Sequence, residues 1–170
     1  LQGVSILKPR TRIMSIAVGD TLPSITLKTN GPDGPEDLNT GEFFKGRKVV
    51  LFAVPGAFTP GCSNTHMPGF VVNADALLDK VDAIACMAVN DAFVLDAWQK
   101  DQNAERLTML ADGNAEFAKA LGLELDATGG GMGMRSKRFA LIANDGVVEY
   151  IGVDAKGVDK SSADTVLGQL

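Results

Sequence analysis

Apolar positions along the chain follow two different spacings, which predict strands and helices. Lys48–Val54 is basic at its start and then entirely apolar, and Ala83–Val89 carries no charge. Both segments are typical of strands that are buried on both faces of a parallel sheet. Between them, apolar residues over Met67–Leu78 recur about every 3.6 positions, which predicts an amphipathic helix. Pro68 is expected to kink or restart this helix.

The remaining segments complete an alternating order of elements. Leu22–Lys28 is a candidate edge strand, and Asn30–Glu36 predicts a turn-rich loop. The sequence Asn144-Asp145-Gly146 is a strong hairpin signal. The pattern predicts further helices over Asp91–Gln102, Asn114–Leu121 and Ser161–Leu170, and further strands over Leu107–Ala111, Phe139–Ala143 and Val147–Val153.

This order predicts one α/β domain over residues 14–170. A strand–helix–strand crossover, followed later by a hairpin and a helix, gives a mixed central sheet with helices on both faces. That is the thioredoxin-like fold, with Asn90–Lys137 inserted between its two halves. Residues 1–13 are treated as an N-terminal extension, either a tag remnant or a targeting tail.

Composition narrows the classes of function. The net charge of -5 over 170 residues argues against nucleic acid or an anionic membrane as a partner. The two cysteines and one histidine are too few for a disulfide framework or a closed zinc site, so we expect no metal and no cofactor. A reducing compartment is indicated: the cytoplasm, or an organelle if residues 1–13 end a transit peptide.

The loop from Pro55 to Cys62 carries the candidate chemistry. It follows a buried strand and opens a helix, where ligand sites of open α/β sheets lie. Unpaired N–H groups and the dipole of the first helical turn stabilise a thiolate at Cys62. Thr59 lies three residues earlier, so its hydroxyl can turn toward the sulfur or a bound oxygen. Pro55 and Pro60 stiffen the loop.

For the other candidate residues, the residue pattern alone allows more than one role. Cys86 lies among apolar neighbours and is interpreted as a buried structural residue. His66, four residues after Cys62, is interpreted as a structural residue, or as one that supports the site without touching the substrate, rather than as the base of a Cys–His hydrolase. Arg135 and Arg138 are both candidates for the cation that activates the thiolate.

Three segments resemble the peroxiredoxins of the atypical type II branch. They are Val54–Phe70 (VPGAFTPGCSNTHMPGF), Cys86–Phe93 (CMAVNDAF) and Arg135–Phe139 (RSKRF). The resemblance extends from about Ile16 to Leu170. It implies a thioredoxin-like peroxidase that reduces hydrogen peroxide and alkyl hydroperoxides and commonly forms a homodimer.

The resemblance also implies roles for particular residues. Cys62 matches the peroxidatic cysteine, which becomes a sulfenic acid. Thr59 matches the residue that orients the peroxide, Pro55 the one that shields the site, and Arg135 the arginine that supports the thiolate. His66 matches a histidine at the edge of the pocket.

The chain departs from part of that branch in how the cysteine is regenerated. Some members carry a resolving cysteine near the C-terminus, but Gly157–Leu170 contains none and Lys160 stands near the expected place. Cys86 is a candidate resolving residue, although a disulfide with Cys62 would require local unwinding. We therefore expect an external reductant: glutathione with glutaredoxin first, thioredoxin second. The alternative function is a redox sensor that relays oxidation to a partner protein.

Overall fold

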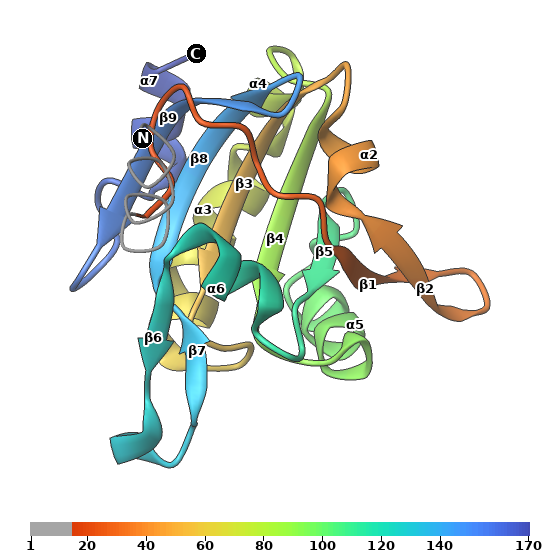
Figure 1. Cartoon of the computed structure of the whole chain (residues 1–170), viewed down its shortest axis with the longest axis vertical. Helices are drawn as coiled ribbons and strands as arrows, with labels where there is room; N and C mark the ends of the chain where they lie inside the picture. The colour runs from red at the N-terminus through yellow and green to blue at the C-terminus, as the bar shows by residue number, and fades with distance from the viewer. Residues whose placement is uncertain (1–14) are drawn as a thin grey trace, which may run out of the picture.

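A seven-stranded mixed sheet forms the centre of the protein, in a computed structural model that describes residues 15–170 (Figure 1). The order across the sheet is β2-β1-β5-β4-β3-β8-β9. Its strands are β1 (Thr26–Gly31), β2 (Gly34–Asn39), β3 (Lys48–Val54), β4 (Ala83–Ala88), β5 (Thr108–Ala111), β8 (Arg138–Asn144) and β9 (Val147–Asp154). The predicted α/β thioredoxin-like fold is confirmed.

The remaining elements cover this sheet or extend from it. The helices are α2 (Thr40–Phe44), α3 (Met67–Val72), α4 (Ala74–Leu78), α5 (Ala92–Asp101), α6 (Glu116–Leu121) and α7 (Ala163–Gly168). A separate hairpin of β6 (Glu124–Asp126) and β7 (Met134–Ser136) projects beyond the sheet, with the 3₁₀ turn η2 (Thr128–Gly130) at its tip (Figure 1). The extension predicted for residues 1–13 lies outside the described residues, and the domain boundary at residue 14 stays a prediction.

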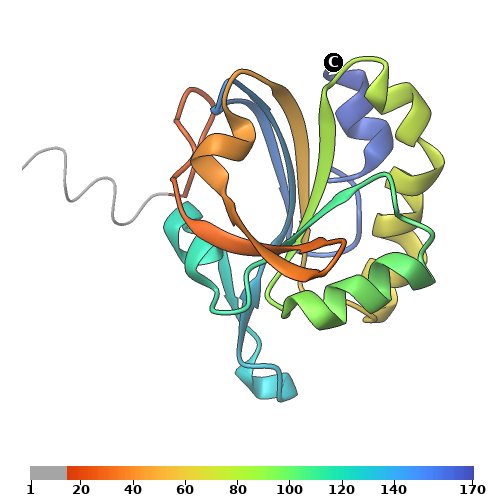
Figure 2. The ribbon, with the colours of Figure 1, turned by 90° about the vertical axis from the view of Figure 1, so that its right-hand side faces the viewer.

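The two faces of the sheet carry separate apolar clusters. Successive side chains of a strand point to opposite faces, so Phe52 packs among residues of α3, α4, α5 and α7. Leu51 packs on the other face, among residues of α2 and α6. Figure 2 shows these two helical layers on either side of the sheet. Because both faces are covered, β4 and all of β3 after Lys48 are apolar, as their sequences predict.

The register of the central strands determines which chain segments meet at one end of these strands. β3 runs parallel to β4 with Val54 opposite Ala88, and antiparallel to β8 with Ala53 opposite Phe139. The end of β3, the end of β4 and the start of β8 therefore lie side by side. The loop with Cys62 leaves from the first of these positions, and Arg138 begins the last.

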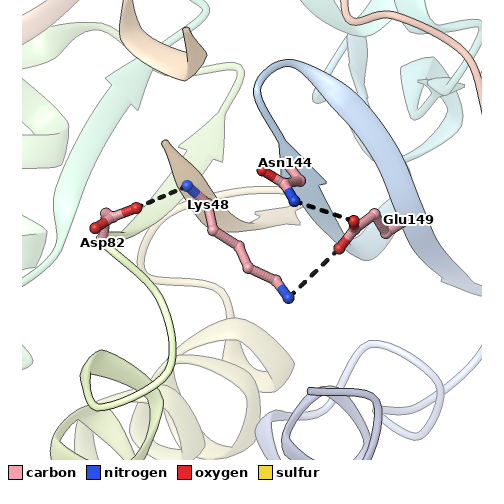
Figure 3. A network of polar contacts seen from close by, with 4 residues as sticks. All are labelled: Lys48, Asp82, Asn144 and Glu149. Atoms are coloured by element: carbon pink, nitrogen blue, oxygen red, sulfur yellow. Dashed lines mark hydrogen bonds and ion pairs between the residues drawn. The ribbon is translucent and has the colours of Figure 1, made fainter. Parts of the chain in front are cut away.

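A network of polar contacts joins the opposite ends of the same strands (Figure 3). The backbone N–H of Lys48, at the start of β3, donates to Asp82 Oδ2 at 2.8 Å. Its ammonium lies 3.5 Å from Glu149 Oε1 on β9, and Asn144 Nδ2 donates to the other oxygen of Glu149 at 3.3 Å. These contacts hold β3, β8 and β9 together at the end remote from Cys62.

The structure corrects the prediction for the N-terminal strands. β1 begins four residues later than the predicted strand Leu22–Lys28, and it pairs with both β2 and β5, so it is not an edge strand. The predicted loop Asn30–Glu36 belongs mostly to the β1–β2 hairpin. Only the two residues between Gly31 and Gly34 turn, because Gly34 adopts a φ of 117° that allows a tight reversal.

The predicted helix over Met67–Leu78 is divided in an unexpected place. A π-helical segment, η1 (Cys62–His66), precedes it, and the N–H of Met67 donates to the carbonyl of Cys62. Pro68 lies in the first turn of α3, where its missing N–H needs no partner. The break between α3 and α4 comes at Asn73 instead of Pro68.

Candidate active site

Cys62 is fully buried at the beginning of the helix that follows β3. Its side chain belongs to the apolar cluster of the α3–α5–α7 face, next to residues such as Phe52 and Phe70, whose rings stack with centroids 4.0 Å apart. Single π turns are rare and occur often at functional sites. The sequence placed Cys62 correctly at a strand end and a helix start.

The loop before Cys62 is held in one conformation by hydrogen bonds. Thr59 Oγ1 donates to the carbonyl of Gly56 at 2.7 Å, and the N–H of Ala57 donates to Asn90 Oδ1 at 3.0 Å. Phe58, between them, has a φ of 65°, a left-handed conformation that costs a bulky residue on the order of 1 kcal/mol. The surrounding contacts therefore maintain a strained turn beside the cysteine.

Arg138 is the described residue whose guanidinium contacts the sulfur. Its Nη2 donates to Cys62 Sγ at 3.3 Å, and its Nη1 lies 2.8 Å from His66 Nδ1. A Cβ on Gly61 would lie 3.1 Å from Nη2, so the bare backbone of Gly61 gives the guanidinium room. Among residues 15–170, Arg138 forms no ion pair with a carboxylate. Its positive charge is thus available to a thiolate.

His66 lies in the same polar chain but within an apolar pocket. Its Nε2 is 2.8 Å from the carbonyl of Ser161, and its ring contacts those of Phe52 and Phe70 at centroid distances of 4.9 and 5.6 Å. Burial, together with the charge of Arg138, lowers the pKa of His66 from 6.5 to about 4, although the bond to Ser161 acts in the opposite direction. The imidazole is therefore neutral at physiological pH.

Arg135, for which the resemblance implied support of the thiolate, contacts the loop before Cys62. Its Nη1 donates to the carbonyl of Pro55 at 3.3 Å, and its Nε donates to the carbonyl of Met132 at 2.9 Å. A Cβ on Gly56 would lie 2.8 Å from that Nη1. Arg135 thus connects the β6–β7 hairpin to the loop before Cys62, while Arg138 contacts the sulfur.

Cys86 shares a face of the sheet with Cys62 but lies in the middle of β4. It is fully buried, and its backbone pairs with those of Phe52 and Met109. Burial, reinforced by the nearby Cys62, raises the pKa of the Cys86 thiol well above its usual value, and Arg138 offsets this only partly. Both cysteines are free thiols. The Cys86 thiol is therefore protonated at neutral pH.

The side chains of β8 point alternately to the two faces of the sheet. This alternation is the sequence signal that distinguishes the two arginines. Phe139 and Leu141 face the cluster of α2 and α6, whereas Ala140 and Ile142 face the cluster that contains Cys62. Residues two apart in a strand share a face, so Arg138 lies on the side of Cys62. Arg135 belongs to β7, outside this strand, and has no such relation.

Residues 15–170 contain no cluster of three or more side chains suited to hold a metal ion. Within the same residues, no helix is both long enough and apolar enough to cross a bilayer.

A thioredoxin-like sheet with a helix-start cysteine facing an arginine defines a thiol-based redox protein, and comparisons with known proteins identify the family. The Redoxin family model matches residues 17–167. The chain is 47% identical to Peroxiredoxin-2E-2, chloroplastic, of Oryza sativa subsp. japonica, over 94% of this chain and 75% of that protein. It is 43% identical to Peroxiredoxin-2B of Arabidopsis thaliana, over 91% of this chain and 98% of that one.

Solved structures agree with these sequence matches. Reduced Prx3 of Vibrio vulnificus in complex with H₂O₂ has a TM-score of 0.87 and 53% identity, over 90% of this chain and 98% of that chain. Peroxiredoxin 5 of Alvinella pompejana has a TM-score of 0.80 and 33% identity, over 91% of this chain and 97% of that one. The chain belongs to the peroxiredoxin family, as its motifs indicate.

The low pKa of His66 predicts a dependence of stability on pH. The unfolded chain binds a proton at this residue near pH 6.5 and the folded chain only near pH 4. This contribution to the free energy of unfolding is complete above pH 6.5 and is lost as the pH falls to 4, a change of about 3 kcal/mol. Urea unfolding of wild type and His66→Gln at several pH values measures it, because the glutamine does not titrate. A constant stability difference between the two across this window would contradict the prediction.

Proposed function

We propose that Cys62 is the residue through which this peroxiredoxin reduces hydrogen peroxide and alkyl hydroperoxides. The Cys62 thiolate attacks one oxygen of the peroxide, so that an S–O bond forms and the O–O bond breaks. The leaving oxygen takes a proton and departs as water or an alcohol, while the sulfur becomes a sulfenic acid. The observation that carries this proposal is the hydrogen bond from Arg138 Nη2 to Cys62 Sγ.

The role that the resemblance implied for Arg135 is here proposed for Arg138. A guanidinium remains charged at all accessible pH values, and one at hydrogen-bonding distance favours an anionic sulfur. The same cation can stabilise the negative charge that develops on the leaving oxygen. Arg135 is proposed to act on the loop, because its bond to the carbonyl of Pro55 helps hold the turn before Cys62.

Thr59 and Pro55 are proposed to shape the site for the peroxide. Thr59 Oγ1 uses its proton on the carbonyl of Gly56, which leaves the oxygen's lone pairs to accept a hydrogen bond from the peroxide hydroxyl. Pro55 has no N–H and its carbonyl is bound by Arg135. Its apolar ring is proposed to limit the access of water to the sulfur.

An external thiol is proposed to regenerate Cys62. Cys86 is fully buried within β4 and lacks the exposure and thiolate character of a resolving residue. A reductant thiol would condense with the sulfenic acid and release water, and a second thiol would reduce the mixed disulfide. Because Cys62 is also fully buried, the π turn must open during this half of the cycle. We favour glutathione with glutaredoxin, and then thioredoxin.

A homodimer is proposed through the end of the molecule that carries the site. Phe58 is 53% exposed and Phe93 is 73% exposed. The bond between Ala57 and Asn90 ties the loop of Phe58 to the turn that leads to Phe93. Exposed aromatic residues at one end of a molecule favour an interface. A second copy of the chain would cover them.

The compartment stays a prediction: the cytoplasm, or an organelle if residues 1–13 end a transit peptide. The printed names of two similar plant proteins place those proteins in the chloroplast, which supports the organellar alternative.

Replacing each arginine in turn tests whether the two have separate roles in peroxide reduction. Arg138→Gln should lower kcat/KM for hydrogen peroxide by about 100-fold or more, because it removes the charged donor from the sulfur. Arg135→Gln should lower it by about tenfold or less, since it loosens the loop without removing that donor. Stopped-flow peroxide reduction measures both variants. Equal losses would contradict the assignment of separate roles.

Exchanging each cysteine tests both the peroxidatic residue and the reductant. Cys62→Ser should abolish peroxide consumption, and Cys86→Ser should retain it with glutathione and glutaredoxin. Loss of thioredoxin-supported activity in Cys86→Ser would show that Cys86 is the resolving cysteine. Wild type should turn over repeatedly with the better reductant, whereas a sensor would be oxidised once and recycle slowly.

Changing an exposed phenylalanine tests the dimer. Phe93→Asp should convert a dimer into a monomer in light scattering at micromolar concentration, since it places a charge in the centre of the proposed interface. Val72→Asp is the matched control, because Val72 is 81% exposed but lies on α3. A monomeric wild type, or a Phe93→Asp variant that stays dimeric, would overturn the proposal.

A further inference from the structure

The guanidinium of Arg138 divides its donors between two acceptors. Nη2 faces Cys62 Sγ at 3.3 Å, and Nη1 faces His66 Nδ1 at 2.8 Å. The planar fork of arginine fixes the angle between these two N–H groups. The position of the acceptor at His66 therefore determines where the other arm lies relative to the sulfur.

The contacts of His66 allow one protonation state. Arginine is only a donor, so His66 Nδ1 must be the acceptor and cannot carry a proton. The carbonyl of Ser161 is only an acceptor, so the Nε2 atom, 2.8 Å away, must carry the proton. Both contacts are satisfied together only by the neutral Nε2–H tautomer. Burial between Phe52 and Phe70 is consistent with a neutral ring.

The carbonyl of Ser161 is itself held in place by a carboxylate. Asp154 Oδ2, at the end of β9, accepts bonds from the N–H and the hydroxyl of Ser161 at 2.9 and 2.7 Å. The same carboxylate group accepts the N–H groups of Asp159 and Lys160 at 2.9 and 3.1 Å. These bonds outweigh the effect of burial and lower the pKa of Asp154 to about 2. The turn before α7 is thus fixed at neutral pH.

We propose that His66 is a positioning residue, which as its neutral Nε2–H tautomer couples the C-terminal turn Asp154–Ser161 to Arg138 and so sets the reactivity of Cys62. This inference rests on the proposed function of Cys62. It assigns His66 a task that an apolar residue of equal size would not perform, because the ring must accept on one edge and donate on the other. The charged groups that act on this ring are Arg138 and Asp154.

Nuclear magnetic resonance on the wild-type protein tests the tautomer directly. His66 is the single histidine of the chain, so its ring nitrogens give unambiguous ¹⁵N signals. At neutral pH, Nε2 should show the shift of a protonated nitrogen and Nδ1 that of a bare one, without exchange averaging. A protonated Nδ1, or rapid exchange between tautomers, would overturn the proposal without any variant.

Two exchanges of His66 test the coupling to the sulfur. The amide of His66→Gln can accept from Arg138 and donate to Ser161, whereas the side chain of His66→Leu can do neither. In a Cys86→Ser background, the ultraviolet absorbance of the Cys62 thiolate against pH gives a midpoint. His66→Leu should raise that midpoint and lower kcat/KM for peroxide about 10- to 100-fold, with the KM for the reducing thiol unchanged. His66→Gln should recover most of the loss. Equal behaviour of the two variants, or a wild-type midpoint in His66→Leu, would overturn the coupling.

A substitution remote from the sulfur tests the hydrogen bonds by which Asp154 holds Ser161. Asp154→Asn weakens the anchor of Ser161 and should lower the peroxide rate about tenfold. Asp159→Asn is the matched control: it removes the same charge from the same turn, and among the described residues the Asp159 carboxylate accepts no hydrogen bond. It should leave the rate unchanged. Equal rates in the two variants would contradict the coupling.

The outcomes separate this inference from the proposed function. If Cys62→Ser remained active, the proposed function would fail whatever His66 does. If Cys62→Ser were inactive while His66→Leu kept the wild-type rate and thiolate midpoint, only the inference would fail.

Discussion

The contact between Arg138 and Cys62 is the interaction on which the rest of the site depends. It places a permanent positive charge in a partly buried position, and no carboxylate among the described residues neutralises it. A buried charge must find other partners or destabilise the fold. Here the partners are the sulfur on one side and a neutral imidazole on the other. A carboxylate in place of His66 would satisfy the arginine better, but it would also compete with the thiolate for the same charge.

The local backbone explains how this arrangement can form. Gly61 leaves the space that the guanidinium fills, and Gly56 does the same for Arg135. Between the two glycines, Phe58 is held in a left-handed conformation, and Cys62 begins a π turn. Strained and irregular backbone of this kind persists only when neighbouring contacts stabilise it.

The two arginines illustrate how a motif can group residues that have separate tasks. Both belong to the segment Arg135–Phe139, and either is chemically suited to support a thiolate. Arg135 lies on β7 and binds the carbonyl of Pro55, whereas Arg138 begins β8 and binds the sulfur. Resemblance led to the first, and the structure places the second at the sulfur. The alternation of β8 could have made the distinction, since Ala140 faces the cluster that contains Cys62.

The sequence by itself determined the central strands, the position of Cys62 at a strand end, the hairpin at Asp145–Gly146 and the thioredoxin-like order. Each of these follows from local spacing or from a backbone preference that a short segment carries. The sequence pattern wrongly predicted a loop where the β1–β2 hairpin lies, because glycine and proline are typical of loops and of tight turns alike. The partners of Cys62 were decided only in the tertiary structure. Arg138 lies 76 residues from Cys62 in the chain, and Ser161, which contacts His66, lies 95 residues from that histidine. Strand register and helix packing bring these residues to the same side of the sheet.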